Sequence, residues 1–415
     1  MIFTKTFDCG LKMVLKRTPS PVSYSALTIK SGTRNELQGK SGIAHMTEHM
    51  LFKGTARRTP KEISDRLELL GGELNAYTTK EETVIYSAVL KEDTSKAVDL
   101  MMEMAFTSAF PENELDKERQ VIIDEINMYK DSPSDCIFDD FEKMLYGEHP
   151  LARPILGSAA SLKKIKSADL KEYTRTNFKP ERMCISITGN ITPQRAEKIV
   201  SDSIRKYIPE GYVPSPTSSP SPGPAESSLS AGTAFIREIS KKNHQTNCII
   251  GTSAYSYSDE ERLTLILLSN MLGGPATNSI LNQLLREKNA LVYTVESIYV
   301  PFADTGSMLI YFGCEKQNTE RCVELIYGEL EKLRSTPVPE RKLAAAKKQL
   351  LGQLAISSDN GEAQALAIGK SMMVFGRIMP DEEVRSKINA ISAEQLQNAA
   401  HSLFAPERVS RLIYK

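Results

Sequence analysis

The segment SGIAHMTEHMLFKGT contains two histidines and a glutamate at a spacing that suits a metal ion. His45 and His49 are four residues apart, so on a helix both imidazoles lie on one face, one turn apart. Two neutral imidazole nitrogens suit Zn²⁺. Glu48 stands one position off this face, where it can approach a water on the metal without being a ligand. The order H-x-x-E-H reverses the zincin motif H-E-x-x-H and predicts a metal site on this helix.

Two glutamates further along the chain can complete such a site. A catalytic zinc needs a third protein ligand and an open position for water. Glu118 and Glu125 are seven residues apart on the helix predicted at Pro111–Tyr129, so they share one face. Apolar Ile122 and Ile126 flank them, and paired carboxylates there are unfavourable unless they are solvated or bind a cation. Taken alone, this helix is equally compatible with an ordinary solvated, charged surface.

The composition is that of an ordinary soluble protein with two or three domains. Of its 415 residues 40% are apolar and 25% are charged, and 52 basic side chains balance 52 acidic ones. This balance argues against nucleic acid as a main partner. We find no apolar run long enough to span a membrane and no signal-peptide pattern at the N-terminus. The six cysteines form no C-x-x-C pair, so we expect free thiols in a cytoplasmic protein.

One segment interrupts this composition. Residues 209–232 (PEGYVPSPTSSPSPGPAESSLSAG) are dominated by proline and serine. Such a stretch cannot bury enough apolar surface to fold, and its prolines favour extended conformations. We interpret it as a linker between an N-terminal catalytic domain at 1–208, which carries the metal motif, and a C-terminal domain at 233–415, which lacks it.

Each half shows the same order of predicted elements. Two strand-like runs come first, followed by helices, an antiparallel-looking strand pair, further helices and a closing strand. The predicted strands are 11–17, 22–32, 73–79, 83–90 and 183–191 in the first half, and 233–240, 247–256, 293–300, 307–314 and 408–415 in the second. The predicted helices are 42–53, 60–70, 94–107, 111–129 and 193–207, then 259–272, 278–288, two from about 319 and 339, and 393–403.

A direct alignment of the two halves supports a repeat. A shift of 228 residues superimposes the helix at 111–129 on the one that begins near 339. The apolar face repeats, with Leu115 on Leu343 and Ile126 on Leu354, but Ala346 and Gln353 replace Glu118 and Glu125. Duplication with the chemistry kept in the first copy explains this pattern, and a coincidence between two amphipathic helices is the alternative.

Taken together, these residues resemble the insulinase/pitrilysin family of inverted-motif zinc peptidases. The resemblance is greatest to its half-size branch, which includes the β subunit of mitochondrial processing peptidase and bacterial processing proteases. HMTEHMLFKGT is similar to the core motif of the family. The family places its third ligand 76 residues after the second histidine, which is Glu125 here, and a supporting glutamate seven residues earlier, which is Glu118. The resemblance covers nearly the whole chain.

Two further segments resemble functional parts of the family. The run NAYTT resembles its active-site edge strand, which implies that Asn75, Ala76, Tyr77 and Thr78 bind substrate. LLREKNALVYTVES resembles the segment in which an Arg and a Tyr seven residues apart reach the scissile region, here Arg286 and Tyr293. The chain departs from the family pattern at one place. The segment LGGPATNSIL stands where the family has a Gly-rich turn followed by Ser-Arg. This departure concerns how that loop grips the substrate and leaves the chemistry untouched.

The resemblance implies a fold, an activity and a set of roles. The fold would be α+β, with two structurally repeated domains, each a mostly antiparallel sheet covered by helices. The activity would be zinc-dependent endopeptidase cleavage of extended peptides or presequences in a closed chamber. His45, His49 and Glu125 would hold one Zn²⁺ per chain, and Glu48 would act as the general base. Glu118 would support the ligands, while Arg286 and Tyr293 would stabilise the oxyanion.

The number of chains follows from the same resemblance. Full-length family members carry four repeated domains and this chain carries two, which implies a dimer in which Arg286 and Tyr293 act on the partner's zinc site. A homodimer suffices, and a heterodimer with a zinc-less paralogue stays open. The alternative function is a non-catalytic structural or interaction subunit of the same fold, whose zinc motif would typically be damaged. The sequence does not distinguish removal of one presequence from general peptide degradation.

Overall fold

The structure is a computed structural model that describes residues 2–215, 234–241 and 244–415. The chain folds into two compact units. Unit 1 comprises Met1–Asn127, Arg153–Pro224 and Ile356–Ile378, and unit 2 comprises Met128–Ala152, Ala225–Ala355 and Met379–Lys415. Most of the predicted linker, residues 216–232, lies outside the described residues.

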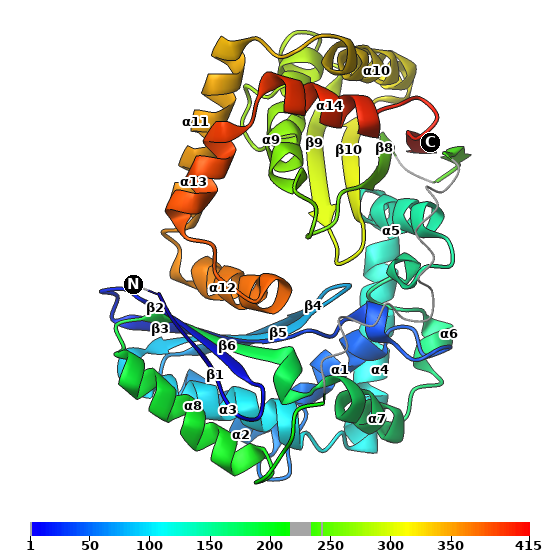
Figure 1. Ribbon diagram of the computed structural model, residues 1–415. Helices are drawn as coiled ribbons and strands as arrows, with labels where there is room; N and C mark the ends of the chain where they lie inside the picture. The colour runs from blue at the N-terminus through cyan, green and yellow to red at the C-terminus, as the bar shows by residue number, and fades with distance from the viewer. Residues whose placement is uncertain (1, 216–233, 242–243) are drawn as a thin grey trace. The chain divides into compact units, whose positions relative to one another are not determined.

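Unit 1 is built on a six-stranded sheet with the strand order β1-β2-β6-β3-β5-β4 (Figure 1). Its strands are β1 (Ile2–Thr6), β2 (Lys12–Arg17), β3 (Val22–Ile29), β4 (Glu73–Thr78), β5 (Thr83–Leu90) and β6 (Met183–Gly189). Only β2 and β6 run parallel among these neighbours, and the other pairs are antiparallel. Central β6 is buried along its whole length, whereas β4 has only exposed and half-buried residues, as expected for an edge strand. This sheet places β4 at its open edge.

Helices cover the sheet of unit 1 and form one main core with it. They are α1 (Ile43–Leu51), α2 (Pro60–Glu68), α3 (Thr94–Thr107), α4 (Glu112–Lys130), α6 (Ala159–Leu162), α7 (Ser167–Asn177) and α8 (Pro193–Tyr207). Leu27 and Ile85 of the sheet share this core with Met46 and Met50 of α1 and Met101 of α3, all fully buried. The core therefore fixes α1 against the sheet.

Unit 2 repeats this architecture with a five-stranded sheet of order β7-β11-β8-β10-β9. Its strands are β7 (Ile236–Ile239), β8 (Thr246–Ala254), β9 (Val292–Pro301), β10 (Gly306–Cys314) and β11 (Ser410–Tyr414). Its helices include α9 (Arg262–Gly273), α10 (Thr319–Ser335), α11 (Glu340–Ser357), α13 (Asp381–Ala390) and α14 (Ala393–Leu403). The order matches β2-β6-β3-β5-β4, including the parallel pair β7–β11. The predicted α+β fold with two repeated, mostly antiparallel domains is confirmed.

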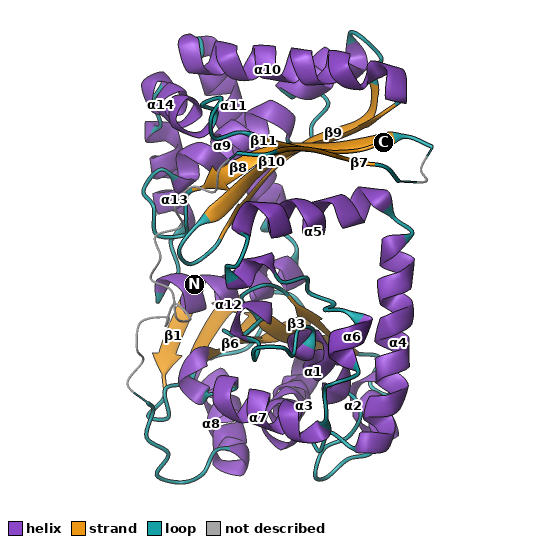
Figure 2. Cartoon of the chain, turned by 90° about the vertical axis from the view of Figure 1, so that its right-hand side faces the viewer, coloured by secondary structure: helices purple, strands orange, loops and turns teal. Residues whose placement is uncertain are grey.

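One helix from each half of the chain belongs to the opposite unit. Helix α5 (Pro133–Tyr146) packs on β8 and β11 of unit 2, where Phe141 shares a cluster with Ile249 and Leu412 (Figure 2). Helix α12 (Gly361–Phe375) packs on β6 and β3 of unit 1. A Cβ on Gly369 would lie 2.6 Å from the Thr28 hydroxyl, so only glycine permits this approach. The compact units therefore differ from the predicted ranges 1–208 and 233–415 in these two segments.

Two further expectations concern membranes and cysteines. Across the described residues, we find no helix with both the length and the apolar character that a membrane span requires. All six cysteines are free thiols, and all but Cys136 are buried. Free, mostly buried cysteines agree with the absence of a C-x-x-C pair in the sequence.

Candidate metal centre

Helix α1 carries both motif histidines, and its buried apolar face fixes the direction in which they point. Ile43, Met46 and Met50 are fully buried in the core, which leaves His45 and His49 together on another face. The two imidazole rings lie with centroids 4.7 Å apart at an angle of 64°. The predicted one-turn spacing is therefore present in the folded helix.

Helix α4 brings the predicted third ligand to these histidines. Its side chains Leu115 and Ile122 are fully buried, so the helix is anchored along one face. The Oε2 atom of Glu125 lies 3.8 Å from Nε2 of His45 and 3.8 Å from Nε2 of His49. One ligand atom from each of the three residues lies within 4.8 Å of the other two. In the part of the chain that the structure describes, no other cluster of three His, Cys, Asp or Glu side chains has this geometry.

This set of donors fits a zinc ion. Nitrogen and oxygen ligands at about 2.0–2.2 Å from a tetrahedral zinc lie roughly 3.3 Å from one another, close to the spacing found here. Burial, and then the neighbouring His49, lower the pKa of His45 to about 4. The His45 imidazole is therefore neutral at physiological pH, as a metal ligand must be. Its Nδ1 atom is buried and has no hydrogen-bond partner among the described residues.

The second histidine is held by a chain of two further side chains. Oε2 of Glu118 lies 2.9 Å from Nδ1 of His49, and Nζ of Lys53 donates to Oε1 of Glu118 at 2.8 Å. Burial alone would raise the pKa of Glu118, but the hydrogen bonds from Lys53 and His49 lower it below the ordinary value. The resulting carboxylate accepts from Nδ1–H, which leaves Nε2 of His49 free to bind a metal. The sequence did not predict a role for Lys53, although this residue lies in the motif HMTEHMLFKGT.

We expect the Glu118→Ala variant to bind zinc about 10- to 100-fold more weakly than the native protein, because its His49 loses the group that sets its tautomer. Lys53→Met should shift the affinity in the same direction. Competition with a chelating dye measures both dissociation constants. Glu114→Ala is the matched control, since Glu114 lies one turn away on α4 and pairs with Lys117. Native affinity in Glu118→Ala would contradict the orienting role.

Glu48 lies beside the histidines in a largely buried position. Burial raises the pKa of Glu48, whereas a hydrogen bond from the Thr78 hydroxyl and the electrostatic effect of the neighbouring His49 ring act in the opposite direction. Its Oε2 atom is buried and finds no partner within the described part of the chain. A carboxylate whose pKa is raised is a better proton acceptor. Glu48 therefore has the environment of a general base.

The predicted substrate strand corresponds to β4. Residues 75–78 pair with β5 on one side only, through Asn75 with Tyr86 and Thr78 with Thr83. In the described residues no strand pairs with the other edge of β4, and Asn75 is exposed. Tyr77 and Ala76 are half-buried. An edge strand of this kind can receive an extended peptide as an additional strand.

Arg286 and Tyr293 lie in unit 2, whereas the three candidate ligands lie in unit 1. Arg286 is exposed in the last turn of a π-helix at Asn282–Glu287, where the sequence predicted a helix at 278–288. Tyr293 lies on β9 with 59% of its surface exposed, and its hydroxyl donates to Oε1 of Glu315 at 3.3 Å. Neither compact unit therefore contains both this pair and the two histidines.

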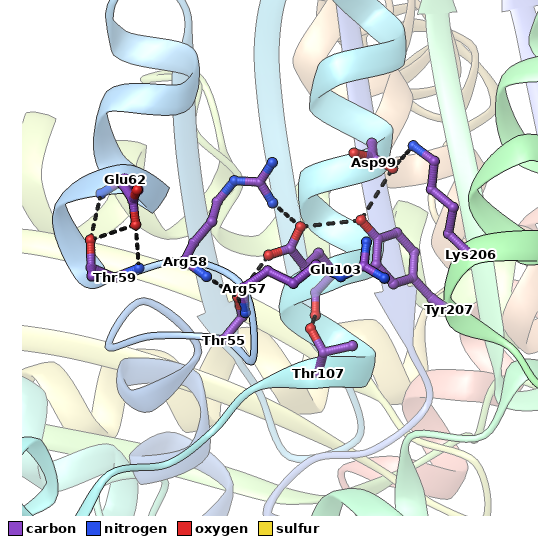
Figure 3. Close-up of polar contacts among 10 residues, drawn as sticks. All are labelled: Thr55, Arg57, Arg58, Thr59, Glu62, Asp99, Glu103, Thr107, Lys206 and Tyr207. Atoms are coloured by element: carbon purple, nitrogen blue, oxygen red, sulfur yellow. Dashed lines mark hydrogen bonds and ion pairs between the residues drawn. The ribbon is translucent and has the colours of Figure 1, made fainter.

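The segment that follows α1 is fixed by a buried carboxylate on α3 (Figure 3). Glu103 is fully buried and accepts from the Thr55 hydroxyl at 2.7 Å and from the Tyr207 hydroxyl of α8 at 3.1 Å. It also forms an ion pair with Arg58, whose backbone N–H donates to Thr55. A buried charge is tolerated only with such partners, so this cluster fixes the segment that follows α1, the helix with the two motif histidines. Its only sequence signal is a lone acid in the apolar run LMMEMAF.

Comparisons with known proteins show to which family the chain is similar. Residues 12–159 match the family described as insulinase (peptidase family M16), and residues 164–350 match the peptidase M16 inactive domain. A protein of Bacillus subtilis named an uncharacterized zinc protease is 31% identical over 100% of this chain and 98% of its own length. One of Rickettsia bellii with the same description is 32% identical over 93% of this chain and 91% of its own.

Solved structures show the same fold. The crystal structure of a protease from Helicobacter pylori has a TM-score of 0.90 at 20% identity, covering 100% of this chain and 99% of that one. A structure described as the peptidase M16 inactive domain from Pseudomonas fluorescens has a TM-score of 0.86 at 21% identity, covering 100% of this chain and 97% of that one. Both likenesses extend over the whole chain.

Proposed function

The chain belongs to the insulinase family of peptidases (peptidase family M16), and from this premise we propose that it is a zinc-dependent endopeptidase acting on extended peptides or presequences. One observation carries the proposal. His45 and His49 of α1 and Glu125 of α4 lie within 4.8 Å of one another although α4 is far along the chain. Relatives named zinc proteases support zinc as the cofactor, one ion per chain.

The residues around the zinc divide the work of peptide hydrolysis. When bound, zinc supplies Lewis-acid chemistry by polarising the scissile carbonyl and activating a water molecule. The Glu48 carboxylate accepts a proton from this water and returns it to the nitrogen of the leaving amine. Lys53 and Glu118 hold the His49 ring in the tautomer that presents Nε2. The burial of Glu48 raises its pKa, which favours this uptake of a proton.

Substrate binding is proposed at β4. A peptide that adds as a strand beside Asn75, Ala76, Tyr77 and Thr78 would pair through its main chain, which gives affinity with little sequence readout. Thr78 also hydrogen-bonds Glu48, so the strand that receives the peptide contacts the proposed base directly. This arrangement favours unfolded or extended substrates over folded proteins.

We further propose a homodimer in which Arg286 and Tyr293 of one chain act at the zinc site of the other. Since one chain carries both the zinc motif and this pair, no second protein is required, although a heterodimer with a zinc-less paralogue would satisfy the same chemistry. The exposed Tyr293 hydroxyl can donate to an oxyanion, with Arg286 as a neighbouring cation. The closed chamber and the cytoplasmic location remain parts of this proposal.

A chelation experiment tests the function. We expect the zinc-loaded protein to cleave unstructured peptides, a chelator to abolish cleavage, and one equivalent of zinc per chain to restore it. Metal content from atomic spectroscopy and the native mass of the assembly are measured on the same sample. A metal-free protein without peptidase activity would instead support the alternative, a structural subunit of the same fold. The intact set of His45, Glu48, His49 and Glu125 argues against that alternative.

A further inference from the structure

We propose that Glu36 is a positioning residue that holds the N-terminus of the metal-binding helix α1 and thereby sets the zinc affinity, an inference that rests on the proposed zinc site. Glu36 lies at the end of a short 3₁₀ turn, Thr33–Asn35, well before the histidines. It is neither a ligand candidate nor a neighbour of Glu48 in the sequence, and the motif gives no indication of its role.

Helix α1 cannot provide its own N-terminal cap. The residue at its N-cap position is Gly42, with φ +91, and a Cβ there would lie 2.8 Å from the carbonyl oxygen of Leu156. Glycine is therefore required, and it has no side chain to accept from the first N–H groups. By contrast, helix α2 begins with Thr59, whose hydroxyl accepts from the N–H of Glu62. The free N–H groups of α1 need an acceptor from elsewhere.

Glu36 supplies that acceptor. Its Oε1 atom accepts from the backbone N–H of Gly42 at 2.8 Å and from that of Ala44 at 3.3 Å. Ala44 directly precedes His45, so these bonds fix the backbone one residue before the first proposed ligand. A negative or polar oxygen at this end also interacts favourably with the helix dipole.

The carboxyl group of Glu36 is buried, and burial of a charged carboxylate is unfavourable. Only 7% of Glu36 is exposed, and its Oε2 atom has no partner among the described residues. Burial raises the pKa of Glu36 to about 8, although the N–H groups of Ala44 and Gly42 oppose the shift. Both contacts with helix α1 use the side chain as an oxygen acceptor. A glutamine side chain offers the same acceptor with the same length.

Hydrogen bonds connect the backbone around Glu36 to the turn that follows β4. Its carbonyl oxygen accepts from Nη1 of Arg153 at 3.0 Å, and the carbonyl of Arg153 accepts from Nζ of Lys80 at 2.6 Å. In addition, the N–H of Arg34 donates to the carbonyl of Lys80 at 2.8 Å. A continuous set of hydrogen bonds therefore joins the end of the proposed substrate strand to the start of the metal-binding helix.

Two substitutions separate the acceptor from the bulk of the side chain. Glu36→Gln keeps an oxygen that can accept from Gly42 and Ala44, whereas Glu36→Met keeps the length but has no such oxygen. We expect the zinc dissociation constant of Glu36→Gln to stay within about threefold of native and that of Glu36→Met to rise about 10- to 100-fold. The constants are measured on the full chain, without any activity assay, by competition between zinc and a chelating dye.

Thr59→Ala is the matched control, because it removes the cap of α2, a helix without ligands. It should lower the unfolding temperature and leave the zinc affinity native. Equal affinities in Glu36→Gln and Glu36→Met would overturn the proposal, as would a tenfold loss in Glu36→Gln. If Glu36→Met does not fold, Glu36→Leu replaces it in the comparison, because leucine also lacks an oxygen that can accept from Gly42 and Ala44. A native protein that binds no zinc would refute the proposed function itself, which is a distinguishable outcome.

Discussion

The Glu48→Gln variant should lose about 10²–10⁴-fold in kcat for peptide hydrolysis while it retains one zinc per chain. The reason is that Glu48 lies beside the ligands without being one, so its loss removes the proton acceptor and leaves His45, His49 and Glu125 in place. Glutamine keeps the size of the side chain and can still accept from the Thr78 hydroxyl. Single-turnover cleavage of a fluorogenic peptide and zinc content measured on the same preparation check both halves of this prediction.

The control for this experiment is Glu92→Gln, which removes an exposed carboxylate outside the site. It should cleave the peptide at the native rate. Retained activity in Glu48→Gln would refute the assigned base. A loss of zinc together with activity would instead place Glu48 among the groups that hold the ion.

Helices α1 and α4, which carry the three candidate ligands, illustrate what could be predicted from the sequence. The motif on α1 is local, so the one-turn spacing of His45 and His49 follows from helix geometry alone. Glu125 was harder to predict as a ligand, because the sequence pattern of its helix is also compatible with an ordinary charged surface. The family spacing selected it, and the folded chain brings its Oε2 atom to 3.8 Å from both imidazoles.

Some of the groups around the candidate ligands could not be predicted from the sequence. Glu36, Lys53 and Glu103 each act through contacts that the chain makes only after folding, at sequence separations that no periodicity encodes. A buried acid such as Glu103 gives only a weak local signal, a single charge within an apolar helix. Its partners Thr55 and Tyr207 come from other elements, so the network cannot be deduced from one segment.

The exchanged helices show a related limit at the level of the fold. The sequence patterns of α5 and α12 indicate that each helix has an apolar face, but an apolar face does not determine which sheet the helix covers. Both were absent from the predicted elements. In the structure, Phe141 of α5 packs on the sheet of unit 2, and Gly369 of α12 allows close approach to the sheet of unit 1. Only the folded chain reveals that the two repeats exchange equivalent helices.

The proposed division of the active site between two chains leads to the second large effect. Glu48→Gln and Tyr293→Phe should each be nearly inactive alone, the first for lack of a base and the second for lack of the hydroxyl that stabilises the oxyanion. When both are co-expressed with different tags, random pairing makes half of the dimers mixed. If Tyr293 acts on the partner's zinc site, each mixed dimer contains one complete site, so about a quarter of the native activity returns.

The arrangement within one chain predicts a different result, because every site of the mixed dimer would then lack one of the two groups. No activity would return, even though purification through both tags proves that mixed dimers formed. Glu48→Gln paired with His49→Ala is the matched control, since both changes affect the zinc half and no pairing can restore it. Recovery in that control would mean that the preparation is contaminated with native protein. Recovery only with Tyr293→Phe requires that the scissile bond is held by two copies of the chain at once.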